Sequence, residues 1–283
     1  MTPDPGNGRF SSGGRNASLV WGLASDPGPS REHNEDFAAV GDVDDAATTG
    51  RSPIFAVADG LGGHAAGEVA SRVAIEAMID SWNSSFVGDA SKSLRSAARA
   101  ANTAVLDESR RIGQGGMGTT LTALTVTSSE VLVAHVGDSR AYRVQGDSCV
   151  QLTADHSRVG EMLRMKLISP EQAAQHPARS QLTRSLGSAP LVQIDLVREQ
   201  WQVGDSFIIC SDGVWDEVGN ADMAAVISSA GDDCSLAVAA SQLVSMAIER
   251  GSPDNVTAVV VTVTSAIPLV RGPERRSLFR RRS

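Results

Sequence analysis

Cysteine is scarce in this 283-residue chain, and the few cysteines form no recognisable pattern. Cys149, Cys210 and Cys234 are odd in number and far apart, and no Cys-x-x-Cys motif occurs. This count disfavours both a disulfide framework and a zinc knuckle. We therefore expect a protein of a reducing, cytoplasmic compartment.

Long apolar runs are also missing. No stretch reaches the roughly 18 apolar residues that a membrane-spanning helix needs. The most apolar late segment, 256–263, is short and contains Thr, so it predicts a strand. Residues 1–16 are rich in Gly, Ser, Pro and Asn and lack the apolar core of a signal peptide. The sequence thus predicts neither a transmembrane segment nor a cleaved leader.

Positive charge is in short supply, except at the end of the chain. The formal net charge is -8, which gives no electrostatic reason to expect nucleic acid as a partner. Residues 271–283, however, contain six Arg and one Glu. We expect flexible tails at 1–16 and 265–283 around a single domain at 17–264. The basic tail is either a solvated end or a weak docking segment for an acidic partner or an anionic membrane.

The periodicity of apolar residues predicts an α+β domain. Strands are expected at 19–24, 37–40, 54–58, 119–127, 131–136, 141–144, 191–197, 207–210 and 256–263. Helices are expected at 65–82, 90–112, 221–228 and 235–250, with two shorter pieces between residues 155 and 187. Strands and helices do not alternate strictly, which disfavours a doubly wound parallel sheet. The order favours antiparallel sheets with helices packed outside them.

Acidic residues recur at the ends of the predicted strands. Asp59 follows 54–58, Asp138 follows 131–136, and Asp212 follows 207–210. An Asp-Gly pair alone is a common turn, but strand ends held by a rigid sheet can bring distant side chains together. Clustered carboxylates repel one another unless cations lie among them. Because oxygen ligands without thiolate or a His pair favour Mg²⁺ or Mn²⁺ over zinc, the set indicates a hydrolytic centre with two metal ions.

Eight short motifs together resemble one known family. They are Arg31-x-x-Asn34-Glu35-Asp36, Asp59-Gly60-Leu61-Gly62-Gly63-His64, Gly118-Thr119-Thr120, Gly137-Asp138-Ser139-Arg140, Asp155-His156-Ser157, Thr183-Arg184-x-Leu186-Gly187, Ser211-Asp212-Gly213 and Ser252-Pro253-Asp254-Asn255-Val256-Thr257. In type, order and spacing they resemble the bacterial branch of the metal-dependent protein serine/threonine phosphatases, the protein phosphatase 2C family. The resemblance covers about 17–264. It implies a central β-sandwich of two antiparallel sheets flanked by pairs of helices, with a flap segment near the active site.

The resemblance also implies a set of metal ligands, with Mn²⁺ or Mg²⁺ as the cofactor. Asp59 would bridge two ions, with the Gly60 carbonyl as a further ligand. Asp138 would help Asp212 to hold a third, weaker ion. The first ion would also be held by Asp212 and Asp254, and the second would be served by Glu35 and Asp36.

The activity that follows from the resemblance is hydrolysis of phosphoserine and phosphothreonine. Two metal ions neutralise the phosphate dianion and lower the pKa of a water that attacks phosphorus in line. Arg31 would clamp the phosphate, because its planar fork donates two parallel hydrogen bonds. The implied partners are phosphorylated proteins and a bacterial serine/threonine kinase that the enzyme opposes. We expect a monomer.

Two positions depart from family patterns. Eukaryotic members place His directly after Asp-Gly, where this chain has Leu61. His64 comes three residues later, and it is either a general acid or a side chain that caps or packs at the start of a helix. Family members commonly have Gly where Lys166 stands in the flap. A Lys there is strained if the preceding helix ends in the usual left-handed way, and unstrained if it ends differently.

Other functions compete with this interpretation. A cysteine phosphatase needs Arg six positions after its Cys, and a nucleotide hydrolase needs a P-loop motif; the chain has neither. An inactive relative that only binds phosphoproteins would typically have lost a metal ligand, whereas Asp59, Asp138, Asp212 and Asp254 are all present. An enzyme that prefers small phosphoesters stays open, because its metal chemistry would be identical.

Overall fold

Two six-stranded antiparallel sheets form the centre of the molecule. The computed structural model describes residues 9–41, 52–62, 65–84, 89–113, 116–230 and 236–267. The first sheet has the order β1-β2-β12-β11-β8-β9, and the second has the order β10-β7-β6-β4-β3, with β5 paired to β4. The strands of the first sheet are β1 (Phe10–Arg15), β2 (Leu19–Asp26), β12 (Val256–Val263), β11 (Ser206–Cys210), β8 (Arg140–Gln145) and β9 (Ser148–Gln151). Those of the second are β10 (Asp195–Glu199), β7 (Val131–Val136), β6 (Leu121–Val126), β4 (Ile54–Leu61), β3 (Asp36–Gly41) and β5 (Gly118–Thr119).

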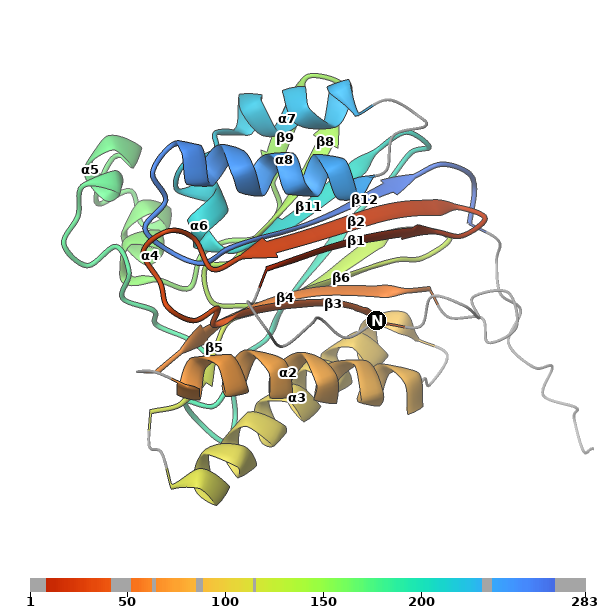
Figure 1. Cartoon of the computed structure of the whole chain (residues 1–283). Helices are drawn as coiled ribbons and strands as arrows, with labels where there is room; N and C mark the ends of the chain where they lie inside the picture. The colour runs from red at the N-terminus through yellow and green to blue at the C-terminus, as the bar shows by residue number, and fades with distance from the viewer. Residues whose placement is uncertain are drawn as a thin grey trace, which may run out of the picture.

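Helices cover both outer faces of the sandwich, as Figure 1 shows. α2 (Ala65–Ser84) and α3 (Ala90–Ile112) pack on the second sheet, and α7 (Asn220–Ser229) and α8 (Leu236–Glu249) pack on the first. Phe55 and Phe207 are fully buried between the sheets. Met78 and Leu94 are buried under the α2–α3 pair, and Leu243 under the α7–α8 pair. The predicted sandwich of two antiparallel sheets flanked by helix pairs is confirmed.

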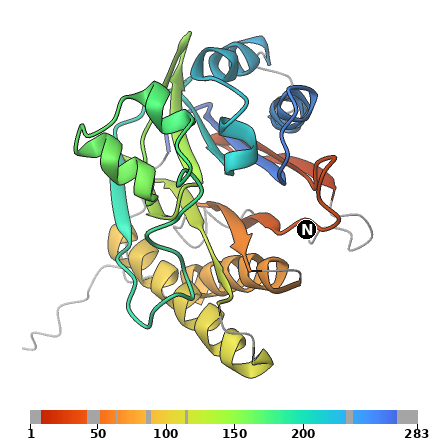
Figure 2. The ribbon, with the colours of Figure 1, turned by 90° about the vertical axis from the view of Figure 1, so that its left-hand side faces the viewer.

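Three short helices complete the fold near one end of the strands. They are α4 (Arg158–Arg164), α5 (Pro170–Ala174) and α6 (Asp212–Trp215). In Figure 2, α4 and α5 form the green segment beside the strands, which corresponds to the predicted flap. Ser157 caps α4, and Ser169 caps α5 through the expected capping box with Gln172.

Strand β1 lies inside the segment that we predicted to be a flexible tail, 1–16. It pairs with β2 from Phe10↔Ser25 to Arg15↔Val20, so the ordered domain begins before residue 17 and that boundary is corrected. The sequence FSSGGR has no alternation of apolar residues, and backbone pairing to the edge of the sheet makes it a strand. The basic tail at 271–283 lies outside the described residues.

Two further details differ from the sequence prediction. The strand expected at 119–127 is divided into β5 and β6, because the N–H of Thr120 donates to the Asp59 carbonyl (2.9 Å). The strand expected at 191–197 begins only at Asp195. Among the described residues, no helix has the length and hydropathy that crossing a bilayer requires.

Candidate metal centre and active site

The predicted acidic residues meet at one end of the sandwich, on the left in Figure 1 beside β5 and α6. Asp36 at the start of β3 stands opposite Asp59 near the end of β4. Asp212 lies two residues after the end of β11, and Asp254 lies two residues before β12, which pairs antiparallel with β11. Asp138 follows β7 and precedes β8, the other neighbour of β11. The antiparallel pairing therefore gathers residues that lie up to 218 positions apart in the sequence.

Glycines let the segments that carry these acids approach closely. A Cβ on Gly60 would overlap the carbonyl oxygen of Gly67, near the start of α2. A Cβ on Gly213 would overlap the carbonyl oxygen of Asn255. Backbone thus packs directly on backbone on both sides of the acidic cluster, which no larger residue would permit.

The backbone of Asp59 is held by two threonines. Its N–H donates to the Thr120 hydroxyl (2.9 Å), and its carbonyl accepts from the Thr119 hydroxyl (2.8 Å). Thr120 also shares a hydrogen bond with Ser139, the neighbour of Asp138 (2.7 Å between the hydroxyl oxygens). The β4 and β7 strand ends are therefore coupled through buried hydroxyl groups.

The Asp36 carboxylate is buried but not isolated. The Ser211 hydroxyl donates to it (2.7 Å), and the N–H of Thr257 donates to the oxygen of Ser211 (3.1 Å). Burial raises the pKa of Asp36 to about 7, although hydrogen bonds from Ser211 and Thr257 oppose the shift. The Ser211 hydroxyl thus links β3, which carries Asp36, to β12, which carries Thr257.

Burial and mutual repulsion dominate the electrostatics of the cluster. Burial raises the pKa of Asp59 and of Asp212 well above the ordinary aspartate value, and the charges of neighbouring carboxylates raise both further. Burial, followed by the charge of Asp155, raises the pKa of Asp138 to about 7. Such a donor set, made entirely of hard oxygens and short of positive charge, fits Mg²⁺ or Mn²⁺.

The acidic side chains do not, as they stand, form a closed coordination shell. Within the described ranges, no three His, Cys, Asp or Glu side chains are grouped so that they could hold an ion. Asp254 instead accepts a hydrogen bond from Nη2 of Arg31 (2.8 Å).

Arg31 lies at the rim of the acidic end. Its side chain is half exposed, and that of Asp254 is about one-third exposed, with fractions of 50% and 35%. A pocket at this rim is lined by Ser30, Arg31, Glu32, His33, Glu35 and Asn255. The guanidinium is therefore close to the acids and still accessible from solvent.

Asn255 organises the loop that carries Glu35, a role that sequence reasoning did not assign. Its side-chain oxygen accepts from the N–H of Glu35 (2.8 Å), and its side-chain nitrogen donates to the carbonyls of Pro27 and His33 (2.9 Å each). The signal was its place directly after Asp254, in a motif already singled out for its acid.

The flap ends its first helix with a strained lysine. The N–H groups of Lys166 and Leu167 donate to the carbonyls of Leu163 and Met162 (2.9 Å each), and Lys166 has φ 57°. This is the left-handed helix end, where a side chain costs about 1–2 kcal/mol relative to Gly. The helix therefore ends in the left-handed way, and Lys166 is strained rather than relaxed.

Two of the five histidines, His135 and His156, are buried, and they have structural hydrogen-bond partners. His135 is buried against Thr122, and burial lowers its pKa to about 3, as expected for a core side chain. Nδ1 of His156 accepts from the N–H of Gly137 (3.1 Å), so its Nε2–H donates to Asp195. His64, the candidate general acid, lies outside the described residues.

Comparison with known proteins agrees with this arrangement. The family model of Protein phosphatase 2C matches residues 30–244. The serine/threonine phosphatase stp of Listeria innocua is 36% identical over 242 residues, which are 84% of this chain and 93% of that protein.

Solved structures show the same fold. The serine/threonine phosphatase PstP/Ppp of Mycobacterium tuberculosis has a TM-score of 0.75 and 34% identity, covering 88% of this chain and 100% of that one. A PstP catalytic domain solved in complex with two manganese ions has a TM-score of 0.75 and 32% identity, with 88% and 99% covered. From its motifs, its fold and these matches, we conclude that the chain belongs to the bacterial branch of the protein phosphatase 2C family of metal-dependent serine/threonine phosphatases.

Proposed function

We propose that the acidic end of the sandwich is the active centre through which this enzyme hydrolyses phosphoserine and phosphothreonine in proteins. The observation that carries the proposal is the convergence of Asp36, Asp59, Asp138 and Asp212, whose pKa values are raised by burial and by the charges of nearby carboxylates. Such an arrangement is costly for folding, and bound cations would relieve the cost. This supports a metal centre over a purely structural cluster.

The family resemblance suggests a role for each acidic residue. Asp59, aided by the Gly60 carbonyl, would contact two ions, and Asp138 would contact a third together with Asp212. The full set proposed to hold Mn²⁺ or Mg²⁺ is Glu35, Asp36, Asp59, Gly60, Asp138, Asp212 and Asp254. When bound, the ions supply neutralisation of the phosphate dianion and a water of lowered pKa.

Arg31 would bind the substrate phosphate. Its present partner is Asp254, and a metal ion at Asp254 would compete for that carboxylate and release the guanidinium. The freed fork can donate two parallel hydrogen bonds to phosphate oxygens. The leaving alkoxide also needs a proton, and His64 remains the candidate donor on sequence grounds alone.

The proposal extends to the setting of the reaction. We include as partners phosphorylated proteins and a serine/threonine kinase that the enzyme opposes, as the family resemblance implies. A cytoplasmic location, a monomeric state and weak docking through the basic tail also belong to this proposal, on the sequence grounds given above.

Turnover of a phosphothreonine peptide with Mn²⁺, and with EDTA instead, tests the central proposal. We expect hydrolysis with Mn²⁺, its loss with EDTA, and its recovery when Mn²⁺ is returned. A small aryl phosphate assayed in parallel separates a protein phosphatase from an enzyme that prefers small phosphoesters. Full activity after exhaustive chelation would contradict the metal centre. Binding of the phosphopeptide without turnover would favour a non-catalytic module.

A further inference from the structure

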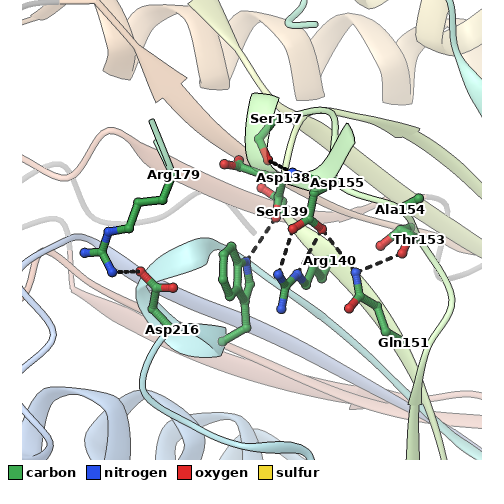
Figure 3. A network of polar contacts seen from close by, with 12 residues as sticks. Asp138, Ser139, Arg140, Gln151, Thr153, Ala154, Asp155, Ser157, Arg179 and Asp216 are labelled. Atoms are coloured by element: carbon green, nitrogen blue, oxygen red, sulfur yellow. Dashed lines mark hydrogen bonds and ion pairs between the residues drawn. The ribbon is translucent and has the colours of Figure 1, made fainter. Parts of the chain in front are cut away.

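Arg140 joins the acidic end to the flap, as Figure 3 shows. It opens β8, two residues after Asp138, and its Nε and Nη2 donate to the two carboxylate oxygens of Asp155 (2.9 and 2.7 Å). Its Cζ lies 3.4 Å from the centre of the Trp215 ring, and its Nη1 donates to the Tyr142 hydroxyl (3.3 Å). One guanidinium, with a side chain that is only 20% exposed, therefore contacts two other segments as well as its own strand.

Trp215 carries this contact to the acidic residues. Its indole N–H donates to the backbone carbonyl of Asp138 (3.0 Å). It also ends α6, the short helix that begins at Asp212. The guanidinium of Arg140 stacks on the Trp215 ring. Because Trp215 hydrogen-bonds the segment of Asp138 and lies in the helix that begins at Asp212, this stacking supports both acidic segments.

Asp155 carries the contact to the flap. It stands three residues before Arg158, where α4 begins, and its carbonyl accepts from Nη1 of Arg164 at the other end of that helix (3.0 Å). The next residue, His156, donates its N–H to the carbonyl of Gly137 (2.7 Å). Gln151 adds a hydrogen bond to the Asp155 carboxylate (3.1 Å). The base of the flap is thus tied to the segment that carries Asp138.

We propose that Arg140 is a positioning residue, which through its planar fork and its stacking on Trp215 holds the Asp138–Asp212 side of the acidic site in register with flap helix α4. The inference rests on the proposed role of the acidic site. A lysine would keep the charge of Arg140 but could neither grip both oxygens of Asp155 nor lie flat on the ring. The geometry of the guanidinium is therefore the feature to test.

The chain offers a matched control on the same strand. Arg143 donates Nε and Nη2 to the carboxylate of Asp205 (3.1 and 2.7 Å) and Nη1 to Glu199 (2.7 Å). Its side chain is 16% exposed, against 20% for Arg140. Asp205 precedes β11, at the end of the strand opposite to Asp212. Arg143→Lys therefore breaks a comparable clamp away from the acidic site.

Two measurements on Arg140→Lys and Arg143→Lys test the proposal without relying on activity. Calorimetric titration of Mn²⁺ into metal-free protein should show the weakest-bound ion loosened about tenfold in Arg140→Lys, the scale typical of lost supporting contacts. Hydrogen exchange of the α4 amides should be about tenfold faster in the same variant, because the base of the helix is released. Arg143→Lys should match the wild type in both.

Two further variants divide the proposal into its halves. Trp215→Phe keeps a ring beneath Arg140 but removes the hydrogen bond to Asp138, so it should loosen the weak ion and leave α4 exchange unchanged. Asp155→Asn weakens the link from Arg140 to the flap, so it should speed α4 exchange and leave the affinity for the weak ion unchanged. If Arg140→Lys fails to fold, the Trp215→Phe and Asp155→Asn variants still test the proposal.

Kinetics supply the final readout. With the phosphothreonine peptide, Arg140→Lys should need about tenfold more Mn²⁺ for half-maximal rate, whereas Arg143→Lys should not. Wild-type Mn²⁺ affinity and α4 exchange in Arg140→Lys would overturn the inference, as would equal changes in Arg143→Lys. A wild-type protein that binds Mn²⁺ but does not hydrolyse the peptide would overturn the proposed function only, because the first two measurements would still report on Arg140.

Discussion

Strand β11 has an aspartate beyond each of its ends, Asp205 buried and Asp212 partly buried, and the two stand in opposite environments. Asp205, before the strand, accepts hydrogen bonds from Arg143 (2.7 Å), from Gln145 (2.8 Å) and from the N–H of Gln202 (2.8 Å). Asp212, after the strand, lies among other carboxylates, and burial and their charges raise its pKa well above normal. The charge of Asp205 is therefore stabilised by hydrogen-bond donors, whereas the charge of Asp212 is destabilised by burial and by neighbouring carboxylates.

The difference separates a structural acid from a functional one. A buried charge that is paired and hydrogen-bonded contributes to a specific fold. A buried carboxylate held among others is unfavourable by itself, and it becomes favourable only when a cation arrives. Strand β11 therefore connects the Asp205 end, where the charges are balanced by the protein itself, to the Asp212 end, where we propose that metal ions balance them.

The largest effect is expected when the acidic end loses its central ligand. Asp59→Asn should lower kcat/KM by about 10³-fold or more, on the scale of losing a main charge-stabilising element. It should also leave the metal-free fold at least as stable, because a charge near other charges of the same sign is removed. Peptide turnover and thermal unfolding measure the two parts. Near wild-type kcat in the variant would show that the centre lies elsewhere.

The reverse pattern is expected at the other end of β11. Asp205→Asn removes the more buried of the two carboxylates that pair with Arg143 and leaves Glu199 as its remaining partner, which should cost up to about 3 kcal/mol of unfolding free energy. Peptide turnover per folded molecule should be unchanged. Denaturant unfolding together with activity at low temperature checks both. A loss of turnover in a folded variant would break the distinction between the two ends.

A pH dependence follows from the raised pKa values. Burial raises the pKa of Asp36 and of Asp138 to about 7, from 3.8, so the metal-free folded state holds more protons than the unfolded state between these values. Stability from these groups is present below the unfolded pKa and is lost as pH rises through about 7, on the order of 1–4 kcal/mol per group.

Bound Mn²⁺ should remove this loss, because it stabilises the charged carboxylates. The difference in melting temperature between Mn²⁺ and EDTA samples should therefore widen as pH rises toward about 7 and beyond. The lowered pKa values of His135 and His156 act in the opposite direction but in both samples, so the difference isolates the acidic groups. A gap that stays constant with pH would contradict the account.

The smallest effect on stability is expected at the rim. The pair between Arg31 and Asp254 is half exposed, so Arg31→Ala should change unfolding free energy by no more than about 1 kcal/mol. Its loss should nevertheless raise KM, and lower kcat if the fork tightens in the transition state. Steady-state kinetics on the phosphopeptide decide this. An unchanged kcat/KM would exclude the phosphate clamp.

Strong periodicity made much of the fold predictable. The bounds of β7, β12 and α3 were predicted as found, because each is a long apolar or amphipathic run with clear ends. β1 and β9 were missed, since edge strands with mixed polar residues are defined by their neighbours. α6 is a single turn, too short for a periodic signal.

The site was predictable in its acids and not in their partners. Asp59, Asp138 and Asp212 are marked by apolar strands that end one or two residues before them, and antiparallel pairing was enough to expect that they meet. The pairing of Arg31 with Asp254 and the stacking of Arg140 on Trp215 join positions far apart in sequence. No local pattern specifies such contacts, because they depend on how the two sheets and the flap pack.

The most direct measurement is a crystal structure of the protein soaked in Mn²⁺, with the ions located by anomalous scattering. The account predicts two strong peaks at the acidic end, each within about 2.5 Å of a carboxylate oxygen of Asp59. A weaker third peak should lie beside Asp138, while no peak should lie near Asp205. Ions bound without contact to Asp59, or equally at both ends of β11, would contradict the distinction on which the proposed function rests.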